Sequence, residues 1–365
     1  MTSDNLCLYL GNIRVLEVNF NVAYHMVLHE DLLPYQLKKR VGNLTGDLVN
    51  DTVNTRFAFM SFLASRVLSL GRKYSKKILN MLNASQFQND AVKAEVAIMC
   101  HAVSVEDNYW VKYESDSATW DSVNIRRNSL NRSIAQVALH GTSLSLQGEL
   151  STPEITTQGA YAKCWKRVDG GLWLYKTSEN KDFESKVEIE VSRVLDKTNV
   201  NHVKYEESTS KGMFCCRCLC MSDDRISVVN SIDLSSYASR CGINFLNSML
   251  NLDANSIYKM CIVDYLVANR DRHGGNWGCY YDSSTTRLLG CHPLFDHNNA
   301  FDREEMGRSD GGESQVFLGK SKREVALYSV RKCDFKFNEL PRLKDFYYSD
   351  HYRYVISRAK DLKLI

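Results

Sequence analysis

The sequence contains no apolar run long enough to cross a membrane, and no apolar N-terminal run of the signal-peptide kind. It also lacks a strong net charge, because 46 lysines and arginines nearly balance 43 aspartates and glutamates to give +3. Its short basic patches are typical of a solvated helix face. We therefore expect a cytoplasmic protein without a membrane or a nucleic acid as a direct partner.

Proline is scarce, with 4 residues in 365, and there is neither an internal repeat nor a low-complexity linker. Hydrophobic residues make up 44% and charged residues 24% of the chain, which is the balance of a globular protein with a sizeable core. At this length we expect two domains, or one large unit of two lobes.

The twelve cysteines lack the second Cys or His pair that normally completes a zinc site. In a cytoplasmic protein they are expected to be reduced thiols. Four of them fall in residues 214–221 (FCCRCLCM), where Cys216, Cys218 and Cys220 alternate with Arg217 and Leu219. A period of two residues is that of a β-strand, so we expect a strand with small thiols on one face and no bound zinc.

Hydrophobic periodicity divides the chain into helical and strand-forming stretches. Helical spacing predicts helices over 45–82, 91–103, 128–139, 182–196, 243–250, 256–268 and most of 322–365. Alternation predicts strands over 161–168, 172–176, 203–206, 213–221 and 225–229, with a further alternating run at Leu144, Leu146 and Leu150. The strands on either side of Gly170-Gly171 form a predicted hairpin. The order is a helical region, a small antiparallel sheet with one inserted helix, and more helices.

Two segments carry the side chains of a phosphate-transfer site. Residues 269–276 (NRDRHGGN) place a carboxylate, Asp271, five residues before a carboxamide, Asn276. Residues 293–299 (PLFDHNN) add Asp296, 25 residues after the first carboxylate. Kinases orient the acceptor hydroxyl with one Asp and hold Mg²⁺ with an Asn and a second Asp. Turn formation explains the Asp, Asn and Gly residues, but not a second acidic turn beside Phe and Pro, so we expect ATP and Mg²⁺ to bind here.

A kinase sheet also needs a turn that covers the phosphates, a nearby lysine, and a glutamate that pairs with this lysine. Residues 156–160 (TTQGA) are the candidate turn, although they lack the G-x-G-x-x-G pattern and an ordinary hairpin turn explains them as well. Lys176 ends an apolar strand, where it needs an anionic partner if it is buried and none if it reaches water. Glu184, Glu188 and Glu190 are all available on the next predicted helix, and their spacing does not choose among them.

Residues 269–276 resemble the N-x-D-x-H-x-x-N catalytic loop of HipA-like kinases, and their Asp-Arg-His-x-x-Asn core is similar to that of phosphoinositide-3-kinase-like enzymes. Residues 151–159 (STPEITTQG), followed by 163–165 (KCW), resemble phosphate loops of bacterial and phage HipA-like proteins. Residues 107–112 (DNYWVK) and 119–120 (TW) resemble an upstream segment of the same group. The resemblance extends over residues 100–340.

The resemblance implies an α+β, bilobed protein-kinase-like fold with a small antiparallel sheet lobe, an N-terminal helical addition and a helical C-terminal lobe. We accordingly expect a mostly helical region over 1–140, a sheet lobe over 141–230 with the phosphate loop, the lysine strand and the glutamate helix, and a helical lobe over 231–365 with the catalytic and metal loops.

The resemblance also implies a role for each site residue. The residues implied to bind ATP are Lys176, its partner Glu188, and the phosphate-loop residues Thr156, Thr157, Gln158 and Gly159. Asp271 matches the catalytic position, with His273 as a loop brace or phosphate contact. Asn276 and Asp296 match the Mg²⁺ positions.

The implied activity is ATP- and Mg²⁺-dependent phosphate transfer to a Ser or Thr hydroxyl of a protein substrate, with an antitoxin-like partner from the same operon. The alternatives are a small-molecule or lipid kinase of the same fold, and a non-catalytic nucleotide-binding module. The family's phosphate loop can carry an autophosphorylated Ser. Thr156 and Thr157 occupy the corresponding place at the tip of the loop. Two roles are open for their hydroxyls, phosphorylation or turn formation alone.

Overall fold

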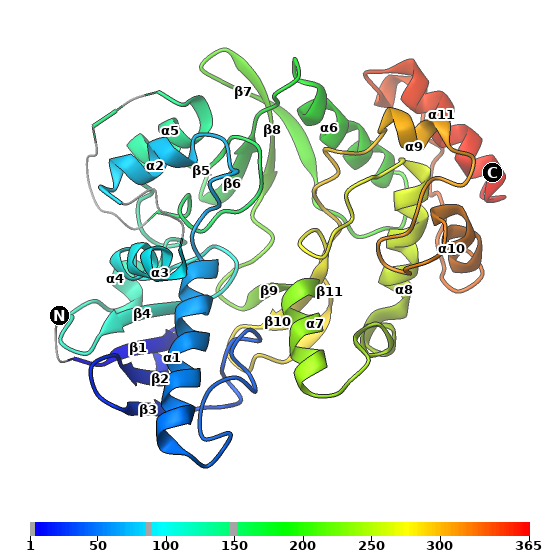
Figure 1. Cartoon of the computed structure of the whole chain (residues 1–365). Helices are drawn as coiled ribbons and strands as arrows, with labels where there is room; N and C mark the ends of the chain where they lie inside the picture. The colour runs from blue at the N-terminus through cyan, green and yellow to red at the C-terminus, as the bar shows by residue number, and fades with distance from the viewer. Residues whose placement is uncertain (1–3, 85–88, 143, 146–151) are drawn as a thin grey trace.

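The computed structural model describes residues 4–84, 89–142, 144–145 and 152–365. These residues form three antiparallel β-sheets with helices packed around them (Figure 1). The predicted α+β class, with a small antiparallel sheet followed by a helical part, is confirmed by this order of elements. No helix of the described residues has both the length and the apolar character that crossing a membrane requires.

The N-terminal part contains a four-stranded sheet that the sequence did not predict. Its order is β3-β2-β1-β4, with β1 at Leu6–Leu10, β2 at Ile13–Asn19, β3 at Tyr24–Val27 and β4 at Tyr109–Tyr113. The helices of this part are α1 (Leu48–Ser65), α2 (Ser75–Met81), α3 (Asp90–Met99), α4 (Trp120–Val123) and α5 (Arg132–His140), of which α5 contacts β5 (Lys163–Val168) of the next sheet. The region over 1–140, predicted to be mostly helical, therefore also contains these four strands beside its helices.

The sequence did not predict these strands because both faces of this sheet are covered. In β1, Leu6, Cys7 and Leu8 are consecutive and all buried, so the strand has no apolar–polar alternation. Its pairing with β4 places Leu6 opposite Tyr113, which is remote in the sequence, so no turn signal marks the pair.

The second sheet has the order β5-β6-β8-β7, with β5 at Lys163–Val168, β6 at Gly171–Lys176, β7 at Tyr205–Ser210 and β8 at Met213–Leu219. Asp169 and Gly170 join β5 to β6 with φ of +49° and +80°, the signs that a type I′ hairpin turn requires. The predicted hairpin is confirmed. Helix α6 (Phe183–Leu195) contacts β7 and β8. The predicted alternating run at 144–150 lies largely outside the described residues.

The third sheet, in the order β11-β10-β9, comprises β9 (Ile226–Asn230), β10 (Gly278–Asp282) and β11 (Leu288–Cys291). The later helices are α7 (Ser231–Arg240), α8 (Phe245–Leu266), α9 (Arg303–Gly307), α10 (Lys322–Ser329), η1 (Leu343–Asp345) and α11 (Ser349–Asp361). A non-helical Asp253 interrupts α8 between its two predicted halves. The prediction for 322–365 is wrong between α10 and α11, where only the short η1 is helical.

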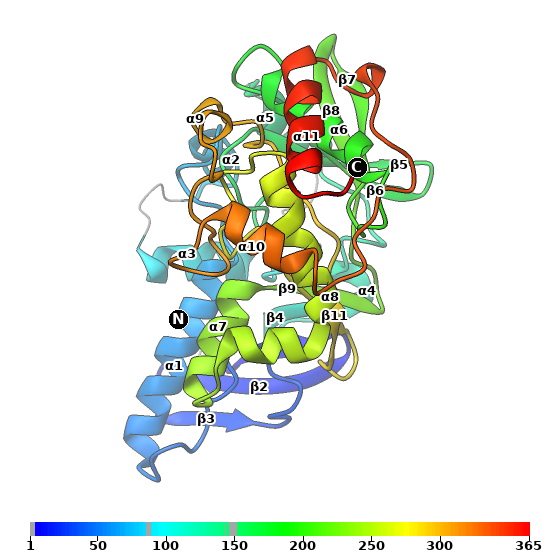
Figure 2. The same cartoon turned by 90° about the vertical axis from the view of Figure 1, so that its right-hand side faces the viewer.

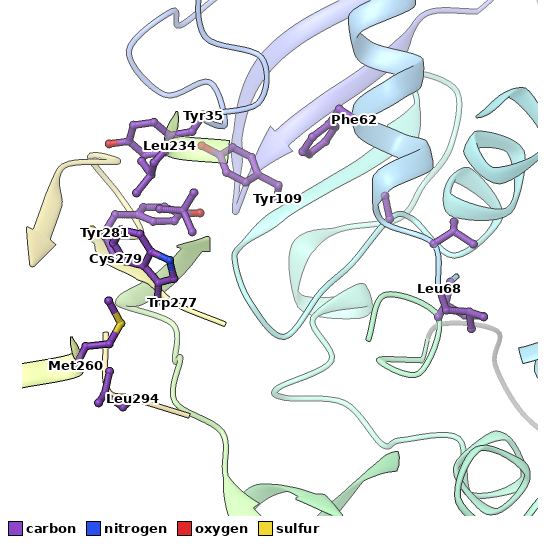
Figure 3. Close-up of a cluster of buried hydrophobic side chains, with 14 of the residues drawn as sticks. Tyr35, Phe62, Leu68, Tyr109, Leu234, Met260, Trp277, Cys279, Tyr281 and Leu294 are labelled. Atoms are coloured by element: carbon purple, nitrogen blue, oxygen red, sulfur yellow. The ribbon is translucent and has the colours of Figure 1, made fainter. Parts of the chain in front are cut away.

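One hydrophobic core joins residues from all three predicted regions. Figure 3 shows Tyr35 and Tyr109 of the N-terminal part gathered beside Trp277, Cys279 and Tyr281 of the C-terminal part. The Tyr35 and Tyr281 rings meet edge to face with centroids 6.0 Å apart. Figure 2 shows α11 lying beside α6, so the C-terminal helix also covers the sheet lobe. The division of the chain at residues 140 and 230 stays a prediction.

Candidate active site

Lys176 is the last residue of β6, and it is buried with 5% of its surface exposed. Its Nζ forms an ion pair with Asp296 Oδ1 and lies 3.5 Å from Glu188 Oε2. Burial alone would lower the pKa of Lys176, but the two carboxylates outweigh it and raise the pKa above its usual value. Burial would raise the pKa of Asp296, but Lys176 and Lys163 hold it below its usual range. Lysine and aspartate are therefore both charged at neutral pH.

The contacts separate the three glutamates that the sequence left open. Glu188 approaches the lysine, its Oε1 accepts a hydrogen bond of 3.1 Å from the backbone of His297, and burial raises the pKa of its carboxyl. Glu190 instead pairs with His351 of α11 at 2.6 Å. Glu184 accepts a hydrogen bond from the backbone just before α6. Of the three, Glu188 joins the lysine strand to the loop that carries Asp296.

Arg272, which is fully buried, holds the two loops together. Its guanidinium donates to the carboxylate of Asp264 in α8 at 3.0–3.2 Å. Nη1 also donates to the backbone oxygens of Asn276 at 2.7 Å and of Phe295 at 3.2 Å. One side chain thus connects the helix, the 269–276 loop and the 293–299 loop. The sequence motif contains this arginine, but its role was missed because a loop arginine gives no signal of whether it is buried.

Asp271 is partly exposed at the site. Its Oδ2 accepts a hydrogen bond of 2.9 Å from Asn299 Nδ2, and its backbone N–H donates to Asn269 Oδ1 at 3.2 Å. The neighbouring His273 accepts the Gly275 N–H on Nδ1 at 3.0 Å, and its Nε2 lies 3.9 Å from Asp271 Oδ1. These contacts suit His273 as a brace of the loop, while the side chain of Asp271 remains accessible.

Asn276 and Asp296 offer oxygen atoms to a cation. Asn276 is buried and donates Nδ2 to the backbone oxygen of Asp271 at 2.8 Å, which leaves its amide oxygen as the remaining ligand atom. Asp296 has a left-handed backbone (φ +59°), and its Oδ1 accepts from Asn298 at 3.1 Å. Among the described residues no cluster of three His, Cys, Asp or Glu side chains is arranged for a metal. Mg²⁺ fits this sparse set, because it is commonly held by one or two carboxylates, substrate phosphates and water.

The two threonines of the candidate phosphate loop do not lie at an exposed tip. Thr156 is buried, and both hydroxyls donate to the backbone oxygen of Pro153, at 3.3 Å for Thr156 and 2.6 Å for Thr157. Thr157 also accepts a hydrogen bond of 2.9 Å from Trp165 Nε1. These hydroxyls form a turn that packs on β5 through Trp165, which accords with turn formation, and phosphorylation of the loop stays a prediction. The exposed part of the loop is residues 158–160, and its role in phosphate binding stays a prediction.

Lys163 is a second cation at the site, which sequence reasoning missed. It lies opposite Lys176 in the β5–β6 hairpin, and its Nζ donates to the backbone oxygen of Gln158 at 2.9 Å. Burial, with a further contribution from Lys176, lowers the pKa of Lys163 to about 8. Gly159 lies against this ammonium group with φ of +97°, a backbone conformation that a residue with a Cβ rarely adopts, so glycine is favoured there.

A small cavity of about 10 Å³, room for little more than one water molecule, adjoins these groups. It is lined by Tyr161, Lys176, Thr177, Glu184, Ser185, Glu188, Cys216 and Asn298. Small-molecule sites typically measure roughly 300–1,000 Å³. A nucleotide would therefore require this cavity to widen. Of its lining, Tyr161 belongs to the loop before β5, which is residues 158–162.

The cysteine-rich segment forms the strand that its alternation predicted. Cys216 and Cys218 of β8 are buried, and Cys216 lies opposite Lys176. Burial raises the pKa of Cys218 to about 12, which keeps the thiol protonated. The strand is confirmed over 213–219, and the expectation that no zinc is bound stays a prediction.

His292 makes the stability of this region depend on pH. It lies buried against Tyr280 and Phe295. Burial, with a contribution from Arg272, lowers the pKa of His292 to about 4, although a hydrogen bond with the backbone of Pro293 opposes this shift. The unfolded chain binds this proton near pH 6.5 and the folded chain only near pH 4. The stabilisation is thus complete above pH 6.5 and is lost as the pH falls from 6.5 to 4.

We expect the free energy of unfolding to be lower at pH 5.0 than at pH 7.5, with His292 contributing about 1–2 kcal/mol of the difference. Urea titrations of wild type and His292→Gln at both pH values measure this contribution. The variant should lose less stability than wild type on acidification. An equal loss in both proteins would show that His292 does not titrate as described.

No family model and no curated protein sequence matches the chain. Among solved structures, HipA of the Shewanella oneidensis MR-1 toxin–antitoxin system, in complex with HipB and operator DNA, aligns with a TM-score of 0.47 and 12% identity over 98% of this chain and 95% of that one. The Helicobacter pylori proinflammatory kinase CtkA aligns with a TM-score of 0.42 and 14% identity over 56% of this chain and 88% of that one. Both TM-scores are below 0.5, so the function is inferred from the side chains of the site.

Proposed function

We propose that this chain is an ATP- and Mg²⁺-dependent phosphotransferase, a kinase of the HipA-like kind that transfers the γ-phosphate to a Ser or Thr hydroxyl of a protein. The observation that carries the proposal is the buried group of Lys176, Glu188 and Asp296, which comes from strand β6, the next helix α6, and a loop 120 residues after the lysine. A buried lysine between two carboxylates is poised to exchange one of these anions for a phosphate.

Each residue has a role that follows from its contacts. Lys176 binds phosphate oxygens. When Asp296 binds a cation in place of Lys176, Glu188 keeps the lysine ammonium group in position. Asn276 and Asp296 hold Mg²⁺, which when bound neutralises charge on the phosphates. Asp271, accessible beside them, orients the acceptor hydroxyl and takes its proton.

The acceptor and the partner are proposed on the catalytic-loop resemblance alone. A protein Ser or Thr hydroxyl is the favoured acceptor, and an antitoxin-like protein from the same operon is the proposed partner. Incubation with labelled ATP, in parallel with a protein mixture and with small-molecule and lipid hydroxyl acceptors, distinguishes a protein kinase from the alternatives.

We expect the chain to bind Mg²⁺ and a non-hydrolysable ATP analogue, and Asn276→Ala and Asp296→Ala to weaken this binding by at least about tenfold, or about 1.4 kcal/mol. Each substitution removes one of few oxygen ligands of the cation. Isothermal titration calorimetry measures the affinity, and thermal unfolding verifies that each variant is folded.

Asn338→Ala is the matched control, because Asn338 makes a similar hydrogen bond of 3.0 Å to the backbone of Thr198 outside the candidate site. This variant should bind the nucleotide as wild type does. Absence of nucleotide binding by the folded wild type would contradict the proposed function, the non-catalytic nucleotide-binding alternative included.

A further inference from the structure

Asn299 lies between the candidate base and the loop before β5. Its Nδ2 donates to Asp271 Oδ2 at 2.9 Å. Its Oδ1 accepts a hydrogen bond of 3.3 Å from the hydroxyl of Tyr161. Its backbone oxygen accepts the N–H of Arg270 at 3.4 Å, which fixes this residue against the 269–276 loop. A single carboxamide thus connects two segments of the site that are distant in the sequence.

The direction of these bonds fixes how the amide is turned. A carboxamide has a donor and an acceptor end, and the two ends are exchanged when the group rotates by 180°. The carboxylate of Asp271 can only accept, so the N–H₂ end faces it, and the oxygen end accepts the Tyr161 hydroxyl, which holds the amide from its other side. Burial raises the pKa of Tyr161 to about 12, so this hydroxyl retains its proton at neutral pH.

The same bond makes the two carboxylate oxygens of Asp271 unequal. Oδ2 receives the Asn299 donor, whereas Oδ1 lies 3.9 Å from His273 Nε2, beyond hydrogen-bond distance. Oδ1 is therefore the oxygen available to an acceptor hydroxyl.

We propose that Asn299 is a positioning residue that orients Asp271, and that Tyr161 couples this orientation to the closed position of the loop before β5. The proposal rests on the proposed function. In the transfer step the acceptor hydroxyl gives its proton to Asp271 Oδ1, and its oxygen forms a bond to the γ-phosphorus. The bond from this phosphorus to the bridging oxygen breaks, and ADP leaves with the electron pair.

The coupling has a specific consequence for catalysis. When the loop opens to admit a nucleotide, Tyr161 leaves the amide oxygen, and the Asn299 side chain is held only through Asp271. When the loop closes over the phosphates, the amide is held at both ends and Asp271 is aligned. Orientation of the base is thereby restricted to the state in which the nucleotide is enclosed.

We expect Asn299→Ala to lower kcat by about 10–100-fold, because a misplaced catalytic group can cost this much, while the Kd for Mg²⁺ and the ATP analogue stays within about threefold. Asn299→Asp should lower kcat and also move the acidic limb of the pH–rate profile to higher pH, since a second carboxylate favours protonation of its neighbour. A residue that only stabilised the fold would not move this limb.

Tyr161→Phe should lower kcat by about 3–10-fold in wild type and have no further effect in Asn299→Ala, because it acts through the amide. Tyr24→Phe is the matched control, since it removes a tyrosine hydroxyl bond of 2.9 Å to Glu17 in the N-terminal sheet. Its kcat should equal that of wild type.

The outcomes separate the two proposals. A folded wild type that transfers no phosphate to any acceptor contradicts the proposed kinase function. An active wild type with an equally active Asn299→Ala overturns the positioning role. Independent, additive losses from Tyr161→Phe and Asn299→Ala overturn the coupling, because they would place Tyr161 on the nucleotide or another group.

Discussion

Asp271→Asn is expected to lower the rate of phosphate transfer by about 10²–10⁴-fold, the usual contribution of a general base, while the affinity for Mg²⁺ and ATP stays within about threefold. The substitution keeps the size of the side chain and one oxygen acceptor, but it removes the negative charge that takes the hydroxyl proton. Nucleotide binding should persist, because the ion pairs of Lys176 are with Glu188 and Asp296 and do not involve Asp271. Single-turnover transfer measures the rate, and calorimetry measures the affinity.

Asp282→Asn is the control for this substitution. Asp282 closes a turn after β10, where it accepts hydrogen bonds from Ser284 and Thr285, and it has no role in the proposed chemistry. Its transfer rate should match that of wild type. Equal rates for Asp271→Asn and wild type would show that another group serves as the base, and would remove the assignment of residues 269–276 as the catalytic loop.

The elements that the sequence predicted well are those with local signals. The β5–β6 hairpin has a turn whose Asp169 and Gly170 adopt the positive φ that a two-residue turn needs. Helix α6 shows a stripe of valines that is buried against neighbouring strands. Both signals lie within a few residues of the element that they specify. A single sequence is therefore sufficient to predict these two elements.

The elements that escaped prediction depend on distant partners. Strand β1 is apolar on both faces and pairs with β4, which lies beyond three helices. The exposed tip of the loop before β5 is at 158–160, because Trp165 binds the Thr157 hydroxyl. The residues that cover a sheet face, and the residue that bonds a hydroxyl, can be far away in the sequence. Neighbouring residues therefore do not predict them.

The candidate site shows the same division. Asp271 and Asn276 lie within one short motif and Asp296 in the next, so the sequence alone could nominate them, and their grouping around a cation stays a prediction. The choice of Glu188 over its neighbours, which periodicity left open, follows from contacts across the fold. Lys163 looked like an ordinary strand residue, and its importance appears only where the hairpin register places it opposite Lys176.

Arg272→Met is expected to lower the free energy of unfolding by about 3–5 kcal/mol, because it breaks a buried ion pair and leaves one charge without its partner. The side chain of Arg272 is 1% exposed and that of Asp264 is 7% exposed, so water cannot replace the lost donors. The backbone oxygens of Asn276 and Phe295 also lose a donor. Urea unfolding followed by tryptophan fluorescence measures the loss.

Two further variants test the cause of this loss. Arg272→Lys should recover only part of the stability, because one ammonium group cannot reproduce the planar fork that reaches a carboxylate and two carbonyls. Arg272→Met combined with Asp264→Leu should be more stable than Arg272→Met alone, since the uncompensated charge is then absent. If the guanidinium holds the two loops together, both variants should bind Mg²⁺ and ATP more weakly than wild type does.

Arg127→Met is the control for the buried pair. Arg127 forms ion pairs with Asp121 and Asp224, but its side chain is 54% exposed, so water can replace its partners and its removal should cost far less than that of Arg272. The comparison isolates burial, since both substitutions delete a guanidinium that contacts carboxylates. If Arg272→Met and Arg127→Met unfolded at the same urea concentration, Arg272 would not be the buried connection between Asp264 and the two loops, and the alignment of Asp271 with Asp296 would need another cause.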